Sequence, residues 1–147
     1  MDATQFSYSH TQPGTVVRVA IGVTVAGLMG LGAAGVGLAQ VIAVVFIVPL
    51  LLFHSLQVQV TATAVHLAFG VGLISKTIPL DQISSSDPVR NRWYYGFGIR
   101  YTFMGWMWNV SGLDAVEVTY TNGKRFRIGT DDPQGLAAAI SRATQGR

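Results

Sequence analysis

The side chains that could carry catalysis or bind a metal are few and scattered in this chain. Its three histidines, His10, His54 and His66, match no metal-binding spacing. Ser111, His66 and Asp114 supply the residue types of a hydrolytic triad, but nothing in their spacing singles them out. The chain has no cysteine, which excludes disulfides, thiolate metal sites and thiol nucleophiles. We therefore predict a non-enzymatic protein with no catalytic residue, no metal site and no cofactor.

Residues 90–95 combine residue types that suit binding at a membrane surface. Two arginines stand beside three aromatic rings, a mixture typical of the lipid headgroup layer. The predicted membrane-interface residues are Arg90, Arg92, Trp93, Tyr94 and Tyr95. The alternative is that Trp93 and Tyr95 pack inside the domain while the arginines are solvated.

Trp106 and Trp108 form a second candidate binding site. Their rings fall on one side of a predicted strand and would line a groove for a strand or helix of a protein partner. The alternative is that both rings belong to the core. The basic run 124–127 is opposed by Glu117, so we predict no nucleic-acid binding.

Asp131 and Asp132 can be interpreted as a metal-binding pair or as the start of a helix. The helix is favoured because Pro133 fits a first helical position and Asp132 fits the N-cap before it. The apolar stripe of this predicted C-terminal helix consists of Leu136, Ile140 and Ala143.

These candidates must be positioned by the rest of the chain, which begins with a long uncharged stretch. No Lys, Arg, Asp or Glu occurs between Arg18 and Lys76, and ionised side chains are costly inside a bilayer. As one helix, residues 16–53 would measure about 57 Å, nearly twice the hydrocarbon thickness of about 30 Å. We therefore predict a transmembrane hairpin of two helices over residues 16–53, with its turn near residues 35–37.

Small residues recur every fourth position along the first predicted helix. This ridge consists of Gly22, Ala26, Gly30 and Ala34. Small side chains let helices approach closely in lipid, so we predict that the ridge packs against the second helix. The same ridge would also serve a homo-oligomer.

The distribution of charge predicts the orientation in the membrane. All Lys and Arg except Arg18 lie from Lys76 onward, where the formal net charge of +3 resides. By the positive-inside tendency, a multi-pass protein of the inner (plasma) membrane with both termini in the cytoplasm is expected. Residues 1–15 are polar and are predicted to be a flexible tail.

From Leu56 onward, apolar and polar residues alternate as in half-buried strands. Alternation predicts strands near residues 56–62, 65–69, 73–80, 97–103, 106–110, 116–120 and 126–128, with Lys76 pointing outward. A three-residue turn, 121–123, with Gly123 left-handed, would place Val118 opposite Phe126. It would also pair Glu117 with Arg127 on the solvent face.

Three segments carry a resemblance to a known family. They are AFGVGLISKTIPLDQI (68–83), GFGIRYTFMGWMWNVSGLDAVEV (96–118) and GKRFRIGTDDPQGLAAAI (123–140). Together with the order of elements they make residues 54–143 resemble bacterial PH-like domains of the pleckstrin-homology superfold. The resemblance implies a partly open, seven-stranded β-barrel capped by the C-terminal helix and used as a binding or assembly platform. Because the first two predicted strands carry no Lys or Arg, it implies no phosphoinositide site.

The predicted fold class is an α+β membrane protein with three parts. These are a tail (1–15), a transmembrane helical hairpin (16–53) and a PH-like cytoplasmic domain (54–147). We predict a membrane-anchored binding or assembly module that presents its domain to an unknown protein partner or to copies of itself. The alternative is an accessory subunit of a larger membrane transporter or membrane enzyme complex.

Overall fold

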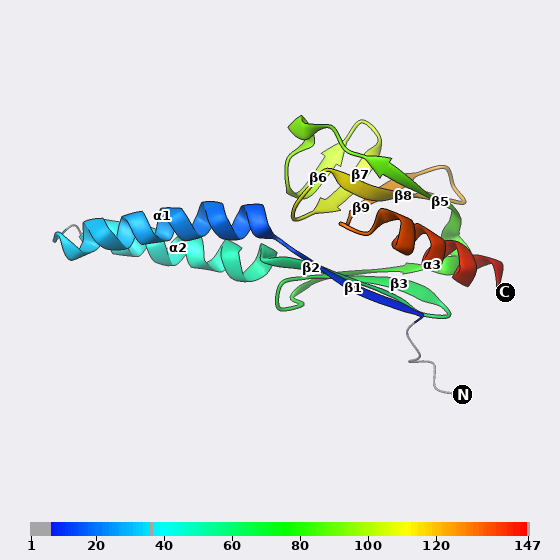
Figure 1. The fold of residues 1–147 in the computed structure, drawn as a ribbon, viewed down its shortest axis with the longest axis horizontal. Helices are drawn as coiled ribbons and strands as arrows, with labels where there is room; N and C mark the ends of the chain where they lie inside the picture. Colours follow the sequence, from blue (N-terminus) through cyan, green and yellow to red (C-terminus); the bar gives the residue numbers. More distant parts are fainter. Residues whose placement is uncertain (1–6, 36, 147) are drawn as a thin grey trace.

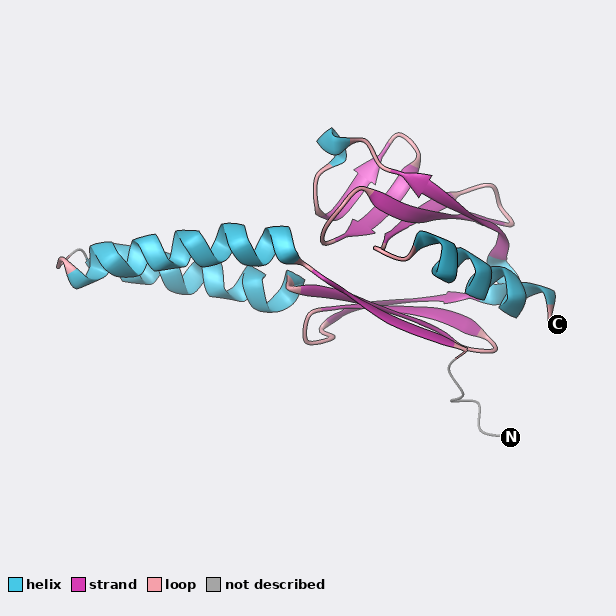
Figure 2. Cartoon of the chain, in the orientation of Figure 1, coloured by secondary structure: helices cyan, strands magenta, loops and turns pink. Residues whose placement is uncertain are grey.

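The computed structural model describes residues 7–35 and 37–146 and has two parts, a helical arm and a head. The arm consists of α1 (Thr15–Ala33) and α2 (Gly37–Phe53), which lie side by side (Figure 1). The head holds two β-sheets and the C-terminal helix α3 (Pro133–Gln145), which lies between the sheets away from the arm (Figure 2). The predicted α+β class is confirmed at this level.

The head is built from a four-stranded and a five-stranded sheet. The lower sheet has the order β1 (Tyr8–Pro13), β2 (Ser55–Val60), β3 (Ala64–Phe69) and β4 (Ile74–Pro79). The upper sheet has the order β5 (Ile83–Arg90), β8 (Asp114–Tyr120), β9 (Arg125–Gly129), β7 (Gly105–Asn109) and β6 (Gly98–Thr102). Two short 3₁₀ turns, η1 (Leu80–Gln82) and η2 (Trp93–Tyr95), flank β5. Only β7 and β9 pair in parallel among the described strands.

The segment predicted to be a flexible tail contains strand β1, so that prediction is wrong for residues 8–13. β1 runs antiparallel to β2 from the pair Tyr8 and Val60 to the pair Pro13 and Ser55. Its alternation is easy to miss because an edge strand needs few apolar residues. The arm therefore leaves the head between two paired strands and returns to the same place. Residues 1–6 lie outside the described part of the chain, as does Val36 in the predicted turn of the hairpin.

Strand β5 was also missed, and the described residues form nine strands rather than seven. β5 contains Pro88 and three consecutive serines, which hide its alternation, and its register with β8 shifts between Ile83 and Ser85. The PH-like barrel therefore stays a prediction, with a different strand count from the one the resemblance implied.

The predicted register between β8 and β9 is confirmed. Val118 lies opposite Phe126, and Gly123 has the left-handed φ of 81° that the turn requires. Arg127 donates from Nε to Glu117 Oε2 over 2.8 Å. This ion pair is not on a solvent face, however, because Arg127 is only 9% exposed.

The outer face of the upper sheet is covered at this ion pair by the segment around η2. Arg127 Nη1 donates to Asn91 Oδ1 over 3.1 Å, and the Arg127 guanidinium carbon lies 5.9 Å from the centre of the Tyr95 ring. Tyr95 is half-buried. The connection between β5 and β6 thus packs down onto a buried charge pair.

One hydrophobic core joins both sheets and α3. Phe69 of β3 is fully buried, and its ring centre lies 5.2 Å from that of Phe53 in the arm and 4.9 Å from that of Trp108 in the upper sheet. Lys76 does not point outward as predicted. It shares the core-facing side of β4 with Ile74 and Ile78, and its ammonium lies 5.3 Å from the centre of the Phe126 ring.

The small-residue ridge of α1 does not pack against α2, so that prediction is wrong. The more covered residues of α1 are Val17, Ile21, Val25, Leu28 and Gly32, whose spacing of four and three defines the face toward α2. Gly22, Ala26, Gly30 and Ala34 are exposed, and a Cβ built on Gly22 or Gly30 would meet nothing within 4 Å. Branched side chains fill the contact instead, because they offer more dispersion contacts than glycine does.

The start of α3 is tied to strand β1. Asp132 is the N-cap, as predicted: Gly135 N donates to its Oδ1 over 3.0 Å. Its other oxygen, Oδ2, accepts a hydrogen bond from Tyr8 Oη over 2.9 Å. Burial, and next to it this hydrogen bond, raise the pKa of Tyr8. Asp132 therefore joins α3 to the strand that precedes the arm.

Replacing this cap gives a prediction for stability. Asp132→Ala removes both hydrogen bonds, and we expect it to lower the free energy of unfolding by about 1–3 kcal/mol. Asp132→Asn keeps an oxygen for the cap and serves as the matched control, with a smaller loss. Thermal unfolding of the two variants in the same detergent measures the difference, and equal midpoints for wild type and Asp132→Ala would contradict this assignment.

Candidate membrane-facing site

The arm is clamped to the head at its base. Gly14 N donates to the carbonyl oxygen of His54 over 2.7 Å, and Arg18 Nε donates to the same oxygen over 3.0 Å. The His54 ring itself is hydrogen-bonded to the carbonyl of Leu51 over 2.9 Å. His54, directly after α2, is thus held by Gly14, directly before α1, and by Arg18 near the start of α1, which joins the two ends of the arm at its base.

The turn between β3 and β4 lies against the end of α2. Gly70 has a φ of 49°, and a Cβ there would collide with the carbonyl oxygens of Leu51 and Leu52. Only glycine fits so close an approach in this backbone conformation. The same turn exposes two apolar side chains beside the arm: Val71 is 61% exposed and Leu73 is 78% exposed.

The predicted membrane-interface segment divides into an exposed and a covered part. Trp93 is 81% exposed and Tyr94 is 54% exposed, and Arg92 Nη1 donates to Tyr94 Oη over 2.7 Å. Tyr95 instead packs toward Arg127, so one of the three aromatics follows the alternative interpretation. Arg90 is exposed at the end of β5.

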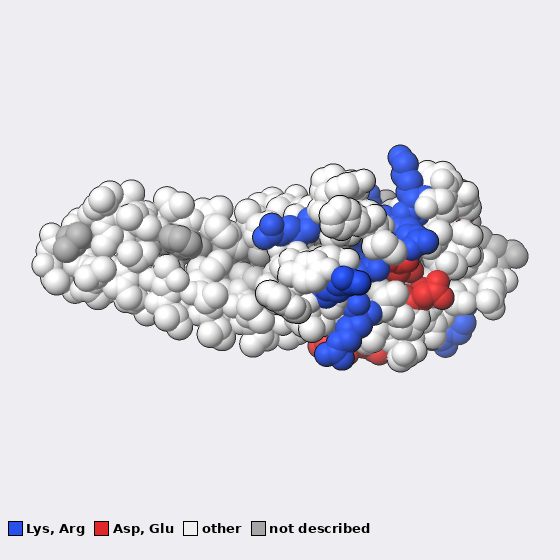
Figure 3. Space-filling view, turned by 90° about the horizontal axis from the view of Figure 1, so that it is seen from above, with Lys and Arg blue, Asp and Glu red and all other residues white. Residues whose placement is uncertain are grey.

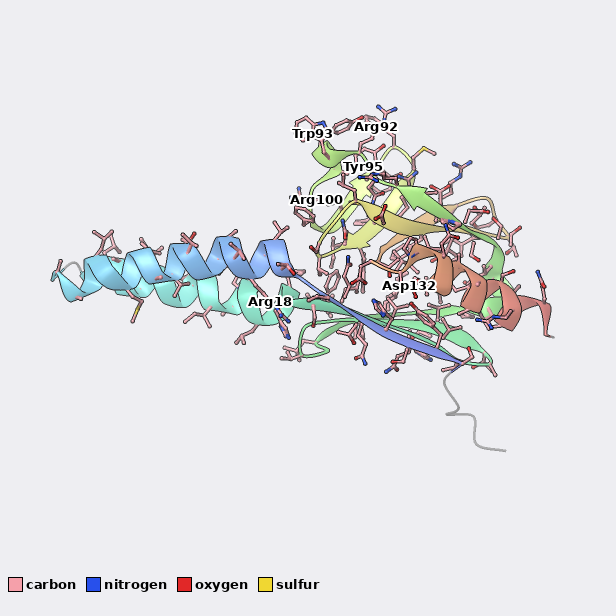
Figure 4. The ribbon with its side chains drawn as sticks, viewed as in Figure 1. Arg18, Arg92, Trp93, Tyr95, Arg100 and Asp132 are labelled. Atoms are coloured by element: carbon pink, nitrogen blue, oxygen red, sulfur yellow. The ribbon has the colours of Figure 1, made fainter. Side chains whose placement is uncertain are left out.

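These exposed groups lie on the side of the head that carries the arm. In Figure 4, Trp93 and Arg100 lie on the edge of the upper sheet nearest the arm, and Arg18 lies at the arm's base. We call this surface the rim and define it by Val71, Leu73, Arg92, Trp93, Tyr94 and Arg100. Lys and Arg gather over the head in Figure 3, whereas the face of the arm seen there carries neither blue nor red atoms over most of its length.

Sequence reasoning missed the contributions of Val71, Leu73 and Arg100 to the rim. Leu73 was placed in the predicted strand 73–80, and Val71 lay between two predicted strands and was given no role, whereas Gly70 and Gly72 both have positive φ and form a turn that exposes Val71 and Leu73. A glycine at every second position was the available signal for that turn. Arg100 stands in the predicted strand 97–103, but only the fold brings it to the arm.

The two tryptophans proposed to line a partner groove have different environments. Trp108 is 8% exposed and packs between Phe69 and Phe126, so it belongs to the core. Trp106 is 52% exposed and lines a hollow of about 730 Å³ at the end of the β6–β7 hairpin. Its ring meets Tyr101, which is 73% exposed on the free edge strand β6. Of the two tryptophans, only Trp106 can line a groove for a protein partner.

Each of the three histidines has a different hydrogen-bond partner. His10 Nε2 lies 2.5 Å from Asp131 Oδ1, and His66 Nδ1 lies 3.0 Å from Thr77 Oγ1. Among the residues that the structure describes, no group of three His, Asp or Glu side chains could hold a metal ion.

Searches of protein-family models, of curated proteins and of solved structures find no match to this chain. Its class therefore follows from the fold alone: an α+β protein of two sheets with a long apolar helix near the N-terminus. That helix, Thr15–Ala33, is long and apolar enough to cross a membrane.

Proposed function

We propose that the chain is a membrane-anchored binding or assembly module, held in the bilayer by the whole arm. The observation that carries this proposal is the uncovered apolar surface of the arm. Val23 and Leu38 are each 69% exposed and Val45 is 63% exposed, and the arm extends away from the head in Figure 1. Water would disfavour so large a contiguous apolar surface, whereas lipid tails solvate it.

Both helices have a length that suits a hairpin through the bilayer. α1 has 19 residues and α2 has 17. At about 1.5 Å per residue they measure about 28 and 26 Å, and α2 stands at the lower limit of about 17 residues for a span. Arg18 is the only charged residue of the arm and lies at its base, where a long side chain reaches the interface. Placement of the head and the N-terminus on the cytoplasmic side agrees with the net positive charge of the head.

The head would act as a non-enzymatic platform. Its hollow beside Trp106 and its free edge strand β6 supply a surface for a protein partner or for another copy of the chain. Anchoring raises the local concentration of such a platform near other membrane proteins without any new contact. A PH-like role of this kind is what the sequence resemblance implies.

The alternative role is that of an accessory subunit in a larger membrane transporter or membrane enzyme complex. It is favoured by the small-residue ridge, because Gly22, Ala26 and Gly30 face away from α2 and leave room for a foreign helix. The same surface would serve a homo-oligomer.

Purification in mild detergent separates the two roles. In the absence of detergent, we expect the tagged chain to sediment with membranes. In mild detergent, we expect it to purify as a monomer or a homo-oligomer. Any protein that purifies with it should bind the head. Trp106→Ala should then release that partner, whereas Gly30→Leu on the ridge should not. A foreign complex that is lost with Gly30→Leu and kept with Trp106→Ala would support the accessory role instead. Recovery of the chain in the aqueous fraction would contradict both.

A further inference from the structure

A groove of about 330 Å³ lies where the arm meets the upper sheet. Its arm side is formed by Val17 and Ile21 from the first turns of α1 and by Pro49 and Phe53 from the last turns of α2. Ile99 and Arg100 from β6 form the opposite side. Most of this lining is apolar, and Arg100 is its only charged member.

The position of the groove indicates what could fill it. This argument rests on the proposed function: if the arm spans the bilayer, its base lies at the depth where acyl chains give way to headgroups. A groove with an apolar wall made by the arm itself is then in direct contact with lipid tails. Its volume is at the low end of ligand sites, about 300–1,000 Å³, which suits part of one acyl chain rather than a whole lipid.

Arg100 supplies the polar end of such a site. Its Nε donates to the carbonyl of Phe97 over 3.1 Å, which fixes the guanidinium and leaves its two terminal nitrogens for an anion. Arg100 is exposed, and no acidic side chain is paired with it among the described residues. A guanidinium held in this way matches the oxygens of a phosphodiester.

We propose that this groove is a binding site for one anionic phospholipid. The phosphodiester contacts the terminal nitrogens of Arg100, and the first methylenes of one acyl chain lie against Ile99, Ile21 and Phe53. The lipid thereby fills the junction between arm and head. Such a site would couple the orientation of the head to the composition of the membrane around it.

The test is a titration of the full-length, delipidated chain in mild detergent with phosphatidylglycerol, followed by native mass spectrometry. Wild type should retain one lipid molecule. Arg100→Gln should weaken this binding about ten- to a hundredfold, since a hydrogen bond to a charged group is being lost. Arg142→Gln is the matched control, because Arg142 Nε also donates to a backbone carbonyl, over 3.2 Å, but on α3. It should bind as wild type does.

A second variant tests the apolar half of the site. Ile99→Trp fills the groove and should weaken lipid binding while Arg100 remains, with an unchanged thermal midpoint as evidence of folding. Glycerol phosphate, which has the charge but no tail, should not compete. Three results would overturn the proposal. They are equal lipid binding by wild type and Arg100→Gln, a loss of binding in Arg142→Gln as large as that in Arg100→Gln, and full competition by glycerol phosphate. These outcomes leave the anchoring role intact, whereas release of the chain from membranes without detergent refutes the anchoring itself.

Discussion

Phe69→Ala should destabilise the head more than any change on its surface. We expect a loss of about 3–5 kcal/mol, because Phe69 is fully buried and the smaller side chain leaves a cavity. For a domain of this size the loss corresponds to a thermal midpoint lower by more than about 10 °C. Phe69 is also the only described ring that meets both the arm, through Phe53, and the upper sheet, through Trp108. Its removal should therefore also weaken the packing of the arm against the head.

Phe103→Ala is the matched control for this prediction. Phe103 is 100% exposed in the turn between β6 and β7, so the same substitution should change stability by less than about 0.5 kcal/mol. Thermal unfolding in one detergent, followed by tryptophan fluorescence, compares the two variants directly, since Trp108 reports on the cavity. Equal midpoints for Phe69→Ala and Phe103→Ala would show that the two sheets do not share the core described above.

Glu117→Ala should have a comparable effect by a different mechanism. The carboxylate accepts a hydrogen bond from Arg127 over 2.8 Å and lies 3.3 Å from Arg125 Nη1. Removing it leaves the charge of Arg127, 9% exposed, without its partner, which typically costs about 3–5 kcal/mol. Because Arg127 supports Tyr95, the loss should also release the segment that carries Trp93. Proteolysis between β5 and β6 would detect that release.

The double variant Glu117→Met with Arg127→Met separates a lost ion pair from a lost fold. It removes both charges together, so most of the stability lost in Glu117→Ala should return. Asp81→Ala, at an exposed acidic residue, should have little effect. A double variant as unstable as Glu117→Ala would mean that packing, rather than an uncompensated charge, explains the loss.

Much of the head could be predicted from the sequence where alternation was regular. The apolar side chains of β2, β3 and β8 alternate with more exposed ones, and the position of Gly123 was enough to choose the register that pairs Val118 with Phe126. The cap at Asp132 was predictable for a similar reason, because capping depends on a few adjacent residues. In each case a local pattern determines the local structure.

The sequence-based predictions failed where the structure of a segment depends on a contact with a distant part of the chain. β1 is polar, yet its backbone pairs with β2, although the whole arm separates the two strands in the sequence. No local pattern indicates a partner so far along the chain. The ridge of α1 was expected to face α2, but the larger residues Val17, Ile21 and Leu28 are the covered ones, and which face meets the partner helix depends on the packing of both helices. The rim is a similar case. Arg100 belongs to the upper sheet and Leu73 to the turn between β3 and β4, and only the fold places both on the side of the head that carries the arm.

We propose that the arm crosses the bilayer as a hairpin and leaves both of its ends on one side. The chain has no cysteine, so single cysteines can be introduced without a background signal. Suitable exposed positions are Ser9 on β1, Ala34 at the far end of the arm and Thr121 in the head. A membrane-impermeant maleimide applied to sealed vesicles of known orientation reads out which side each position faces.

We predict that Ser9→Cys and Thr121→Cys react only when the cytoplasmic face is exposed, and that Ala34→Cys reacts only from the opposite face. Reaction of all three positions from the same side would contradict a hairpin that crosses the membrane. Reaction of Ser9→Cys and Thr121→Cys from opposite sides would contradict it too, since the chain would then cross only once.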